Sequence, residues 1–230
     1  MMRLSLVLAT CFALFSPAAL YAAEECEGLP LIYSTGFDEG AGDWSPTDAD
    51  AWKITDLDGN KVYHQFGQSK YKPPHRSPYN ISLLNDVLVG DFVLKVKVLS
   101  TAKTAGAHRD MCVFFGWQDP ANFYYVHLGL RPDPHSSQIM VVDDAPRKMI
   151  TKNESPGIPW SDDWHQVKIV RKTADGVIEI YFDDMDKPVM VAEDKTFTWG
   201  QIGLGSFDDH GYWDDLKLYG KKVEQPAKPE

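Results

Sequence analysis

The sequence lacks any uncharged apolar run long enough to cross a membrane. The longest, Leu4–Phe15, has about twelve residues, whereas a bilayer core requires roughly twenty. It follows Arg3 and leads into small residues up to Ala23, which is typical of a secretory signal peptide. We therefore expect removal of residues 1–23, and a secreted or periplasmic protein without a transmembrane segment. A lipid anchor on Cys11 would leave almost no room for the apolar segment.

Basic residues are scarce. The chain has 23 Lys and Arg against 33 Asp and Glu, a net charge of −10 at pH 7. This becomes −11 without residues 1–23, which contain one Arg and no acid. A phosphate backbone is held by concentrated Lys and Arg, so we expect no nucleic-acid partner. The charge also disfavours anionic membranes and, less strongly, polyanionic substrates, so neutral ligands and cations fit better.

Cysteine is nearly absent. Only Cys26 and Cys112 remain after residues 1–23. In an oxidising compartment the two could form a disulfide that joins the N-terminal segment to the domain. The alternative is that Cys112 is a small buried apolar residue and Cys26 a free thiol. The sequence leaves both open.

Helical periodicity is missing too, and from Leu31 onward apolar residues alternate with a period of two between Gly, Asp, Asn and Pro turns. The predicted strands are 91–99, 111–117, 123–130, 138–143, 165–172, 177–183, 201–207 and 212–219. The pair Asp175–Gly176 predicts a hairpin turn. We expect one all-β domain, an antiparallel two-sheet sandwich over residues 31–220. A short tail, 24–30, precedes it, a disordered tail, 221–230, follows it, and we expect a monomer.

The predicted strand 123–130 has two different faces. Tyr124, Val126 and Leu128 are expected in the core, whereas Phe123, Tyr125 and His127 are expected to face a solvent-filled groove. A His or Tyr can remove a proton next to a carbonyl group while Arg or Gln stabilises the enolate. The candidates near this face are Tyr125, His127 and Arg109 as catalytic residues, and His108, Gln118 and Gln138 as substrate-binding residues.

Simpler interpretations of these residues stay open. A lone His on a strand is commonly a hydrogen-bonded surface residue, and Asp110 could simply pair with Arg109. His108, His127 and His135 could also bind zinc or manganese, although their spacing is not that of a compact metal motif.

Three segments resemble the concanavalin A-like superfamily, which includes laminin-G-like modules, family-sixteen glycoside hydrolases and the 3-keto-disaccharide hydrolase family. They are TGFDEGAGDW at 35–44, WHQVKIVRKTADGVIEIYFDD at 164–184 and GQIGLGSFDDHGYWDDLKLYG at 200–220. The resemblance implies a jelly roll of two curved sheets with a carbohydrate ligand on the concave sheet. Two irregular segments, 67–78 and 147–163, are long enough to be functional loops. The second contains Trp160, a candidate for stacking on a sugar ring.

The resemblance also implies a structural calcium ion between the first and last strands. Asp214 would be a ligand, together with backbone carbonyls around Phe37 and Asp38. Because Asp214 is expected on the same strand face as Leu216 and Leu218, its carboxylate would need a cation or several donors. The alternative is that Asp214 caps a turn.

The usual catalytic motif of the hydrolases with this fold, Glu-x-Asp-x-Glu, is missing. The glutamates between residues 31 and 220 are Glu39, Glu154, Glu179 and Glu193, on separate predicted elements, so ordinary two-carboxylate hydrolysis is disfavoured. The Gln-Ile-x-Asp pattern of the 3-keto-disaccharide family is matched only partly, by Gln138, Ile139 and Asp143.

We therefore predict a domain that binds a glycan or an oxidised (3-keto) disaccharide, with cleavage by proton abstraction as an open question. The alternatives are a glycan-binding module without catalysis and a laminin-G-like protein-interaction module.

Overall fold

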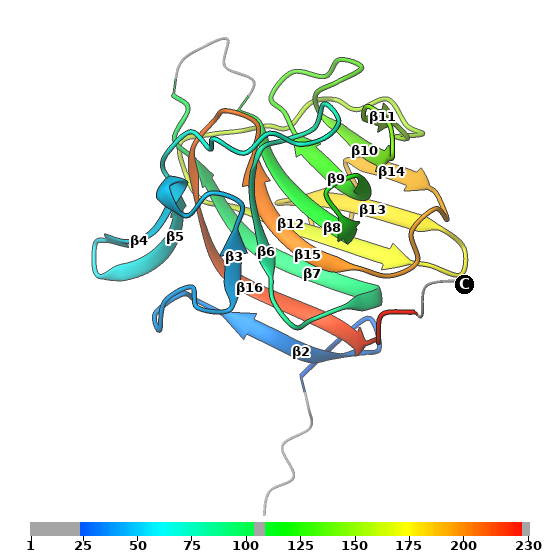
Figure 1. Cartoon of the computed structure of the whole chain (residues 1–230), viewed down its shortest axis with the longest axis horizontal. Coiled ribbons are helices and arrows are strands. Elements are labelled where there is room, and N and C mark those ends of the chain that lie inside the picture. The colour runs from blue at the N-terminus through cyan, green and yellow to red at the C-terminus, as the bar shows by residue number, and fades with distance from the viewer. Residues whose placement is uncertain (1–23, 104–108, 227–230) are drawn as a thin grey trace, which may run out of the picture.

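The computed structural model describes residues 24–103 and 109–226. Two antiparallel sheets pack face to face (Figure 1). The only helical element among the described residues is a short 3-10 helix, η1 (Ala49–Ala51). The predicted all-β sandwich is confirmed.

Sheet I is built around the long strands β7 and β16. Its described strands follow the order β1-β2-β16-β7-β12-β13-β14, and a β4–β5 hairpin pairs with the beginning of β16. The strands are β1 (Glu25–Cys26), β2 (Leu29–Thr35), β4 (Trp52–Leu57), β5 (Asn60–Gln65), β7 (Val89–Ser100), β12 (His165–Lys172), β13 (Val177–Phe182), β14 (Met190–Glu193) and β16 (Gly211–Lys222).

Sheet II lies in front in the view of Figure 1. Its described strands follow the order β11-β10-β9-β8-β15-β6-β3. They are β3 (Trp44–Pro46), β6 (Asn80–Leu84), β8 (Met111–Asp119), β9 (Asn122–Leu128), β10 (Gln138–Asp143), β11 (Lys148–Met149) and β15 (Gln201–Ser206).

The main core lies between the sheets, where alternate side chains of each strand meet. Sheet I contributes Leu94, Val96 and Val98 of β7, and sheet II contributes Tyr124 and Val126 of β9. Each is at most 1% exposed. Full burial of one such apolar side chain contributes roughly 1.5–3 kcal/mol, so this double layer holds the sheets together.

A second apolar cluster covers the opposite, outer face of sheet II. It includes Cys112 and Phe114 of β8 and Phe123 and Tyr125 of β9, all fully buried. Loop side chains such as Tyr71 pack against it. The sequence prediction of an open groove along this whole face was wrong, because β8 is apolar at successive positions and its outward side chains also require cover.

Arg171 of β12 is 2% exposed and organises the β12–β13 hairpin. Its guanidinium donates to the carbonyl oxygens of Gly176 (2.7 Å), Asp194 (2.9 Å) and Phe197 (3.0 Å). Gly176 has φ +79°, and a methyl group there would lie 2.9 Å from the Asp194 oxygen. The hairpin that the Asp-Gly pair predicts is therefore present, and glycine is required in it.

The ends of the domain differ from the prediction. Residues 24–30, expected to be a tail, contain β1 and the start of β2, so the predicted domain boundary at residue 31 is too late. At the other end β16 continues to Lys222, and the Val223 N–H donates to the Leu88 carbonyl (2.9 Å). The predicted signal segment, 1–23, lies outside the described residues. Among the helices of the described part, none is long and apolar enough to span a membrane.

The two described cysteines do not form a disulfide. Cys26 lies on β1 of sheet I and Cys112 on β8 of sheet II, and both are free thiols. Cys112 is fully buried. The interpretation of Cys112 as a small buried apolar residue is the correct one.

Candidate functional site

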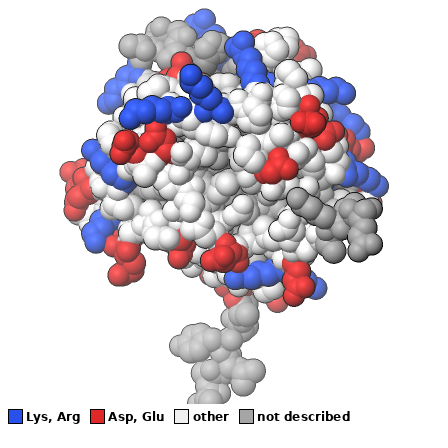
Figure 2. All heavy atoms as spheres, viewed as in Figure 1, with Lys and Arg blue, Asp and Glu red and all other residues white. Residues whose placement is uncertain are grey.

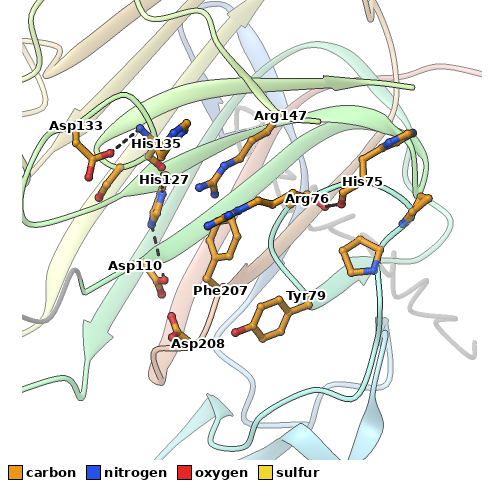
Figure 3. A pocket seen from close by; sticks show the side chains of 14 residues that line it. His75, Arg76, Tyr79, Asp110, His127, Asp133, His135, Arg147, Phe207 and Asp208 are labelled. Carbon is orange, nitrogen blue, oxygen red and sulfur yellow. Dashed lines mark hydrogen bonds and ion pairs between the residues drawn. The ribbon is translucent and has the colours of Figure 1, made fainter. Parts of the chain in front are cut away.

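A pocket of about 650 Å³ opens on the outer face of sheet II, beyond the second apolar cluster (Figure 3). Six parts of the chain meet there: the β5–β6 loop, the residue before β8, the end of β9, the β9–β10 connection, the segment after β10 and the segment after β15. The lining residues are Pro73, Pro74, His75, Arg76, Ser77, Tyr79, Asp110, His127, Asp133, His135, Ser136, Arg147, Phe207 and Asp208.

One end of the pocket is acidic. Asp110 is 5% exposed and exchanges hydrogen bonds with Asp209: its N–H donates to the Asp209 carboxylate (2.8 Å), and its Oδ1 accepts from the Asp209 N–H (3.2 Å). Burial, together with the neighbouring carboxylates of Asp208 and Asp209, raises the pKa of Asp110 to about 9. Asp110 therefore keeps its proton at neutral pH.

His127 lies beside this acid. Its Nδ1 is 2.7 Å from the carbonyl oxygen of His135, which can only accept, so Nδ1 carries the proton. In the neutral ring Nε2 is then an acceptor, and it lies 3.9 Å from Oδ2 of Asp110. With a neutral imidazole the pair combines a hydrogen-bond acceptor with a protonated carboxyl group.

The other end of the pocket is basic. The Arg147 guanidinium lies 4.4 Å from the centre of the Phe207 ring, and its Nη1 donates to the Tyr125 hydroxyl (3.2 Å). Arg76 is adjacent, since its backbone carbonyl accepts from the Arg147 N–H (3.4 Å). Neither guanidinium forms an ion pair with a carboxylate in the described part of the chain.

Phe207 forms an aromatic wall between the two ends (Figure 3). Its ring lies 5.3 Å from that of His127 and 6.1 Å, edge to face, from that of Tyr79. In the view of Figure 2, the charged side chains gather mainly around the rim of this side of the molecule, and the centre is built of other residues.

Three of the predicted site residues come together at the pocket. His127 lines it. Tyr125 is fully buried beneath it, and burial raises the pKa of its phenol. Gln138 pairs with His127 across β9 and β10, and its Nε2 donates to the Asp133 carbonyl (3.0 Å). Tyr125 and Gln138 thus support lining residues, Arg147 and Asp133, and do not line the pocket themselves.

Arg109 and Gln118 do not line the pocket. Arg109 forms an ion pair with Asp162 (2.6 Å), not with Asp110. Gln118 is at the other end of β8, where it donates to the Trp199 carbonyl (3.2 Å). His108 lies outside the described residues.

Trp160 is not an exposed stacking platform. Its ring packs against Phe182 (5.0 Å), and its Nε1 donates to the Leu128 carbonyl (2.7 Å). The sequence prediction placed it in a loop correctly, but the indole is held by the core, where its N–H requires a partner.

Among the described residues, no three His, Cys, Asp or Glu side chains form a metal-binding group. Asp38 and Asp214 lie near each other, although it is the carboxylate of Asp38, not the predicted backbone carbonyl, that lies on the side of Asp214. A methyl group placed on Gly36 would lie 3.5 Å from the Asp38 carboxylate and 3.8 Å from that of Asp214. Asp214 is 6% exposed, accepts from the Asn60 amide (2.8 Å) and has its pKa raised by desolvation. Two converging carboxylates fit a calcium ion, although the Lys61 ammonium already binds the Asp38 carbonyl (2.7 Å).

The position of Asp214 has a different origin from the predicted one. The pairing of β16 with β7 is irregular between Asp214 and Lys217, and Asp215 has φ +46°. This bulge shifts the alternation, so that Trp213 shares the core with Leu216. The prediction that Asp214 continues the stripe of Leu216 and Leu218 was therefore wrong.

Sequence reasoning missed most of the pocket. Arg76 and Arg147 lie in or at the edge of the two irregular segments identified as functional candidates, which was a usable signal. Phe207 and Asp208 follow a core strand, and nothing in the sequence around them indicated a binding site. Asp110 was considered only as a partner for Arg109.

No protein-family model matches the chain, and no curated protein matches its sequence. Solved structures do match. The carbohydrate-binding module CBM66 from Bacillus subtilis superposes with a TM-score of 0.55 at 17% identity, over 77% of this chain and 96% of that one. The acidic lectin of winged bean, complexed with methyl-α-D-galactose, superposes with a TM-score of 0.54 at 12% identity, over 84% of this chain and 98% of the lectin chain. The cellulose induced protein Cip1 superposes with a TM-score of 0.54 at 13% identity, over 85% of this chain and 100% of the Cip1 chain.

The fold is a concanavalin A-like jelly roll. At these identities the likeness shows the fold, and membership of the 3-keto-disaccharide hydrolase family is not shown. In this jelly roll the pocket is built by loops that gather over one end of sheet II.

Proposed function

We propose that the protein binds a carbohydrate outside the cytoplasm, in the pocket beside Phe207. The observation that supports this proposal is the half-buried aromatic ring of Phe207, which lies between an acidic and a basic group of side chains. The apolar C–H face of a sugar packs on such a ring, and its hydroxyls donate to carboxylates and accept from guanidinium groups. Two of the similar structures are named as a carbohydrate-binding module and a sugar-bound lectin, which supports the proposal.

Replacing Phe207 by Ala is expected to weaken glycan binding by roughly tenfold or more, because the stacking surface is lost. The measurement is a glycan panel followed by calorimetry on the chain without residues 1–23. Phe66→Ala is a matched control, since Phe66 is 38% exposed and does not line the pocket. If the Phe207 variant and the unmodified protein bind glycan with equal affinity, this pocket is not the glycan-binding site. A protein-interaction module would bind no glycan on the panel.

A narrower proposal is that the pocket also cleaves an oxidised (3-keto) disaccharide. The pairing of His127 with Asp110 favours it, because an imidazole acceptor can take a proton next to a carbonyl while a protonated carboxyl group donates. The same panel, extended to 3-keto disaccharides and followed for product, distinguishes cleavage from binding alone. Turnover that disappears in His127→Gln, with binding retained, would support cleavage.

We also propose that Asp38 and Asp214 hold a structural calcium ion. Millimolar calcium is then expected to raise the Tm by several degrees over a chelator, since a ligand that binds only the folded state stabilises it, by about 2.7 kcal/mol at a hundredfold excess over Kd. Asp214→Asn should abolish the effect, and Asp186→Asn, at an exposed loop position, should not. An unchanged Tm in the unmodified protein would reject the calcium site.

A further inference from the structure

We infer that the sugar recognised by this pocket is acidic, and that Arg76 and Arg147 bind its carboxylate or sulfate group. This rests on the proposed function, because it names the class of glycan that the same pocket takes. Four features of the pocket support it: the separation of its charges, the fixed position of one guanidinium, the exposed position of the other, and the aromatic wall between the two ends.

The charges of the pocket are divided between its two ends (Figure 3). Asp110 and Asp208 lie at one end of the Phe207 ring, and both Arg side chains lie at the other. Since Asp110 keeps its proton at neutral pH, the acidic end offers sugar hydroxyls both a donor and acceptors. The basic end offers only donors, so it matches an anionic substituent on a sugar ring that packs on Phe207.

Arg147 is held ready for such an anion. Its guanidinium lies on the Phe207 ring and one of its nitrogens is engaged by the Tyr125 hydroxyl. The planar group has five N–H donors, so most remain for a ligand, and two parallel N–H groups match a carboxylate or a sulfate edge. The buried phenol of Tyr125 thereby acts as a positioning group.

Arg76 adds a second charge at the same place. It is exposed and forms no ion pair with a carboxylate in the part of the chain that the structure describes. Figure 3 shows both guanidinium groups on the same side of Phe207. The adjacent His75 is already paired with Asp144 (3.2 Å), which leaves the two Arg side chains for the ligand. Two like charges held together repel each other, and a bound anion removes this cost.

The net charge of the chain limits the size of the ligand. The chain as a whole carries a net charge of −10, so a long polyanion would be repelled as it extends beyond the two Arg residues. A single acidic sugar or a short oligosaccharide stays within the pocket, where the charges of Arg76 and Arg147 are the nearest. The expected ligand is therefore a short oligosaccharide with its acidic residue against Phe207.

The test compares two matched probes, a short oligogalacturonate and its carboxyl-reduced, neutral counterpart, with a sulfated galactose oligosaccharide as a third. The acidic probes are expected to bind at least thirtyfold more tightly than the neutral one. Arg76→Gln and Arg147→Gln should each reduce this preference, measured as the ratio of the acidic to the neutral affinity, severalfold and together nearly remove it. Arg131→Gln replaces an exposed Arg outside the lining residues and should leave the preference unchanged.

Arg147 also packs on Phe207, so its variant could disturb the pocket, whereas Arg76 has no such contact and its variant tests the charge alone. Equal binding of acidic and neutral probes, or a preference that survives loss of both Arg side chains, would overturn the inference and leave glycan binding standing. If no glycan on the panel binds, the proposed function itself fails. Tightest binding of the sulfated probe would still support the inference and would identify sulfate as the acidic group.

Discussion

Replacing Arg171 by Met is expected to lower the free energy of unfolding by about 3–4 kcal/mol. The side chain is 2% exposed, and its guanidinium donates to the carbonyl oxygens of Gly176, Asp194 and Phe197. A methionine fills much of the volume but cannot donate in this nearly dry site. The Gly176 carbonyl keeps the Asp194 N–H (2.9 Å), whereas the Asp194 and Phe197 carbonyls lose their hydrogen bonds from Arg171. A buried unsatisfied polar group costs about 1–3 kcal/mol, so the loss at these two carbonyl groups outweighs any gain in apolar packing.

Chemical denaturation followed by circular dichroism measures this effect. Lys172→Met is the control, because the neighbouring Lys172 is exposed and its loss should change stability by less than about 0.5 kcal/mol. Arg171→Lys should not restore the stability, since one ammonium group cannot replace a planar fork that serves three carbonyls. A loss below about 1 kcal/mol in Arg171→Met would show that these hydrogen bonds contribute little.

The strands were predictable because they obey a local rule. In β7 each inward side chain is apolar and the outward Lys95 and Lys97 are partly exposed, so the period of two identifies both the strand and its core face. The β12–β13 hairpin was predictable for a similar reason, since Asp175–Gly176 supplies the turn between two alternating segments. Such signals depend on residues close together in the sequence.

The outer face of sheet II was not predictable from one strand. In β9, Phe123 and Tyr125 alternate with core residues, which indicates an exposed or a covered face equally well. Whether the face is exposed or covered depends on β8, where Cys112 and Phe114 make the same face apolar, and on a loop that supplies Tyr71. Reading both strands together favours a covered face, and only His127, at the end of β9, reaches the pocket.

The pocket itself depends on contacts between distant segments. Arg76 and Arg147 are joined by a backbone hydrogen bond across the β5–β6 loop and the segment after β10, and Phe207 follows β15. No spacing in the sequence indicates that these residues meet. The bulge at Asp214 is similar, because β16 changes partner there from β5 to β2, and an alternation rule cannot anticipate that change.

Replacing Asp110 by Asn is expected to stabilise the protein at neutral and mildly alkaline pH. Unfolded Asp110 ionises near pH 4, whereas folded Asp110 keeps its proton up to about pH 9, because of burial and the nearby Asp208 and Asp209 carboxylates. Between these values the folded state binds more protons than the unfolded state. Its stability therefore falls as the pH rises, by up to about 1.4 kcal/mol per unit from this one group.

The asparagine side chain of the Asp110→Asn variant is expected to preserve the local structure, because its amide oxygen can accept from the Asp209 N–H and its NH₂ group can donate to Asp208. Urea unfolding at several pH values from 5 to 9 measures the free energy of unfolding. The difference between the variant and the unmodified protein should grow in favour of the variant with each pH unit. Asp163→Asn removes an exposed carboxylate outside the pocket and should give a curve parallel to that of the unmodified protein. Parallel curves for Asp110→Asn as well would mean that Asp110 is ionised in the folded protein, and the donor at the acidic end of the pocket would then be lost from the binding proposal.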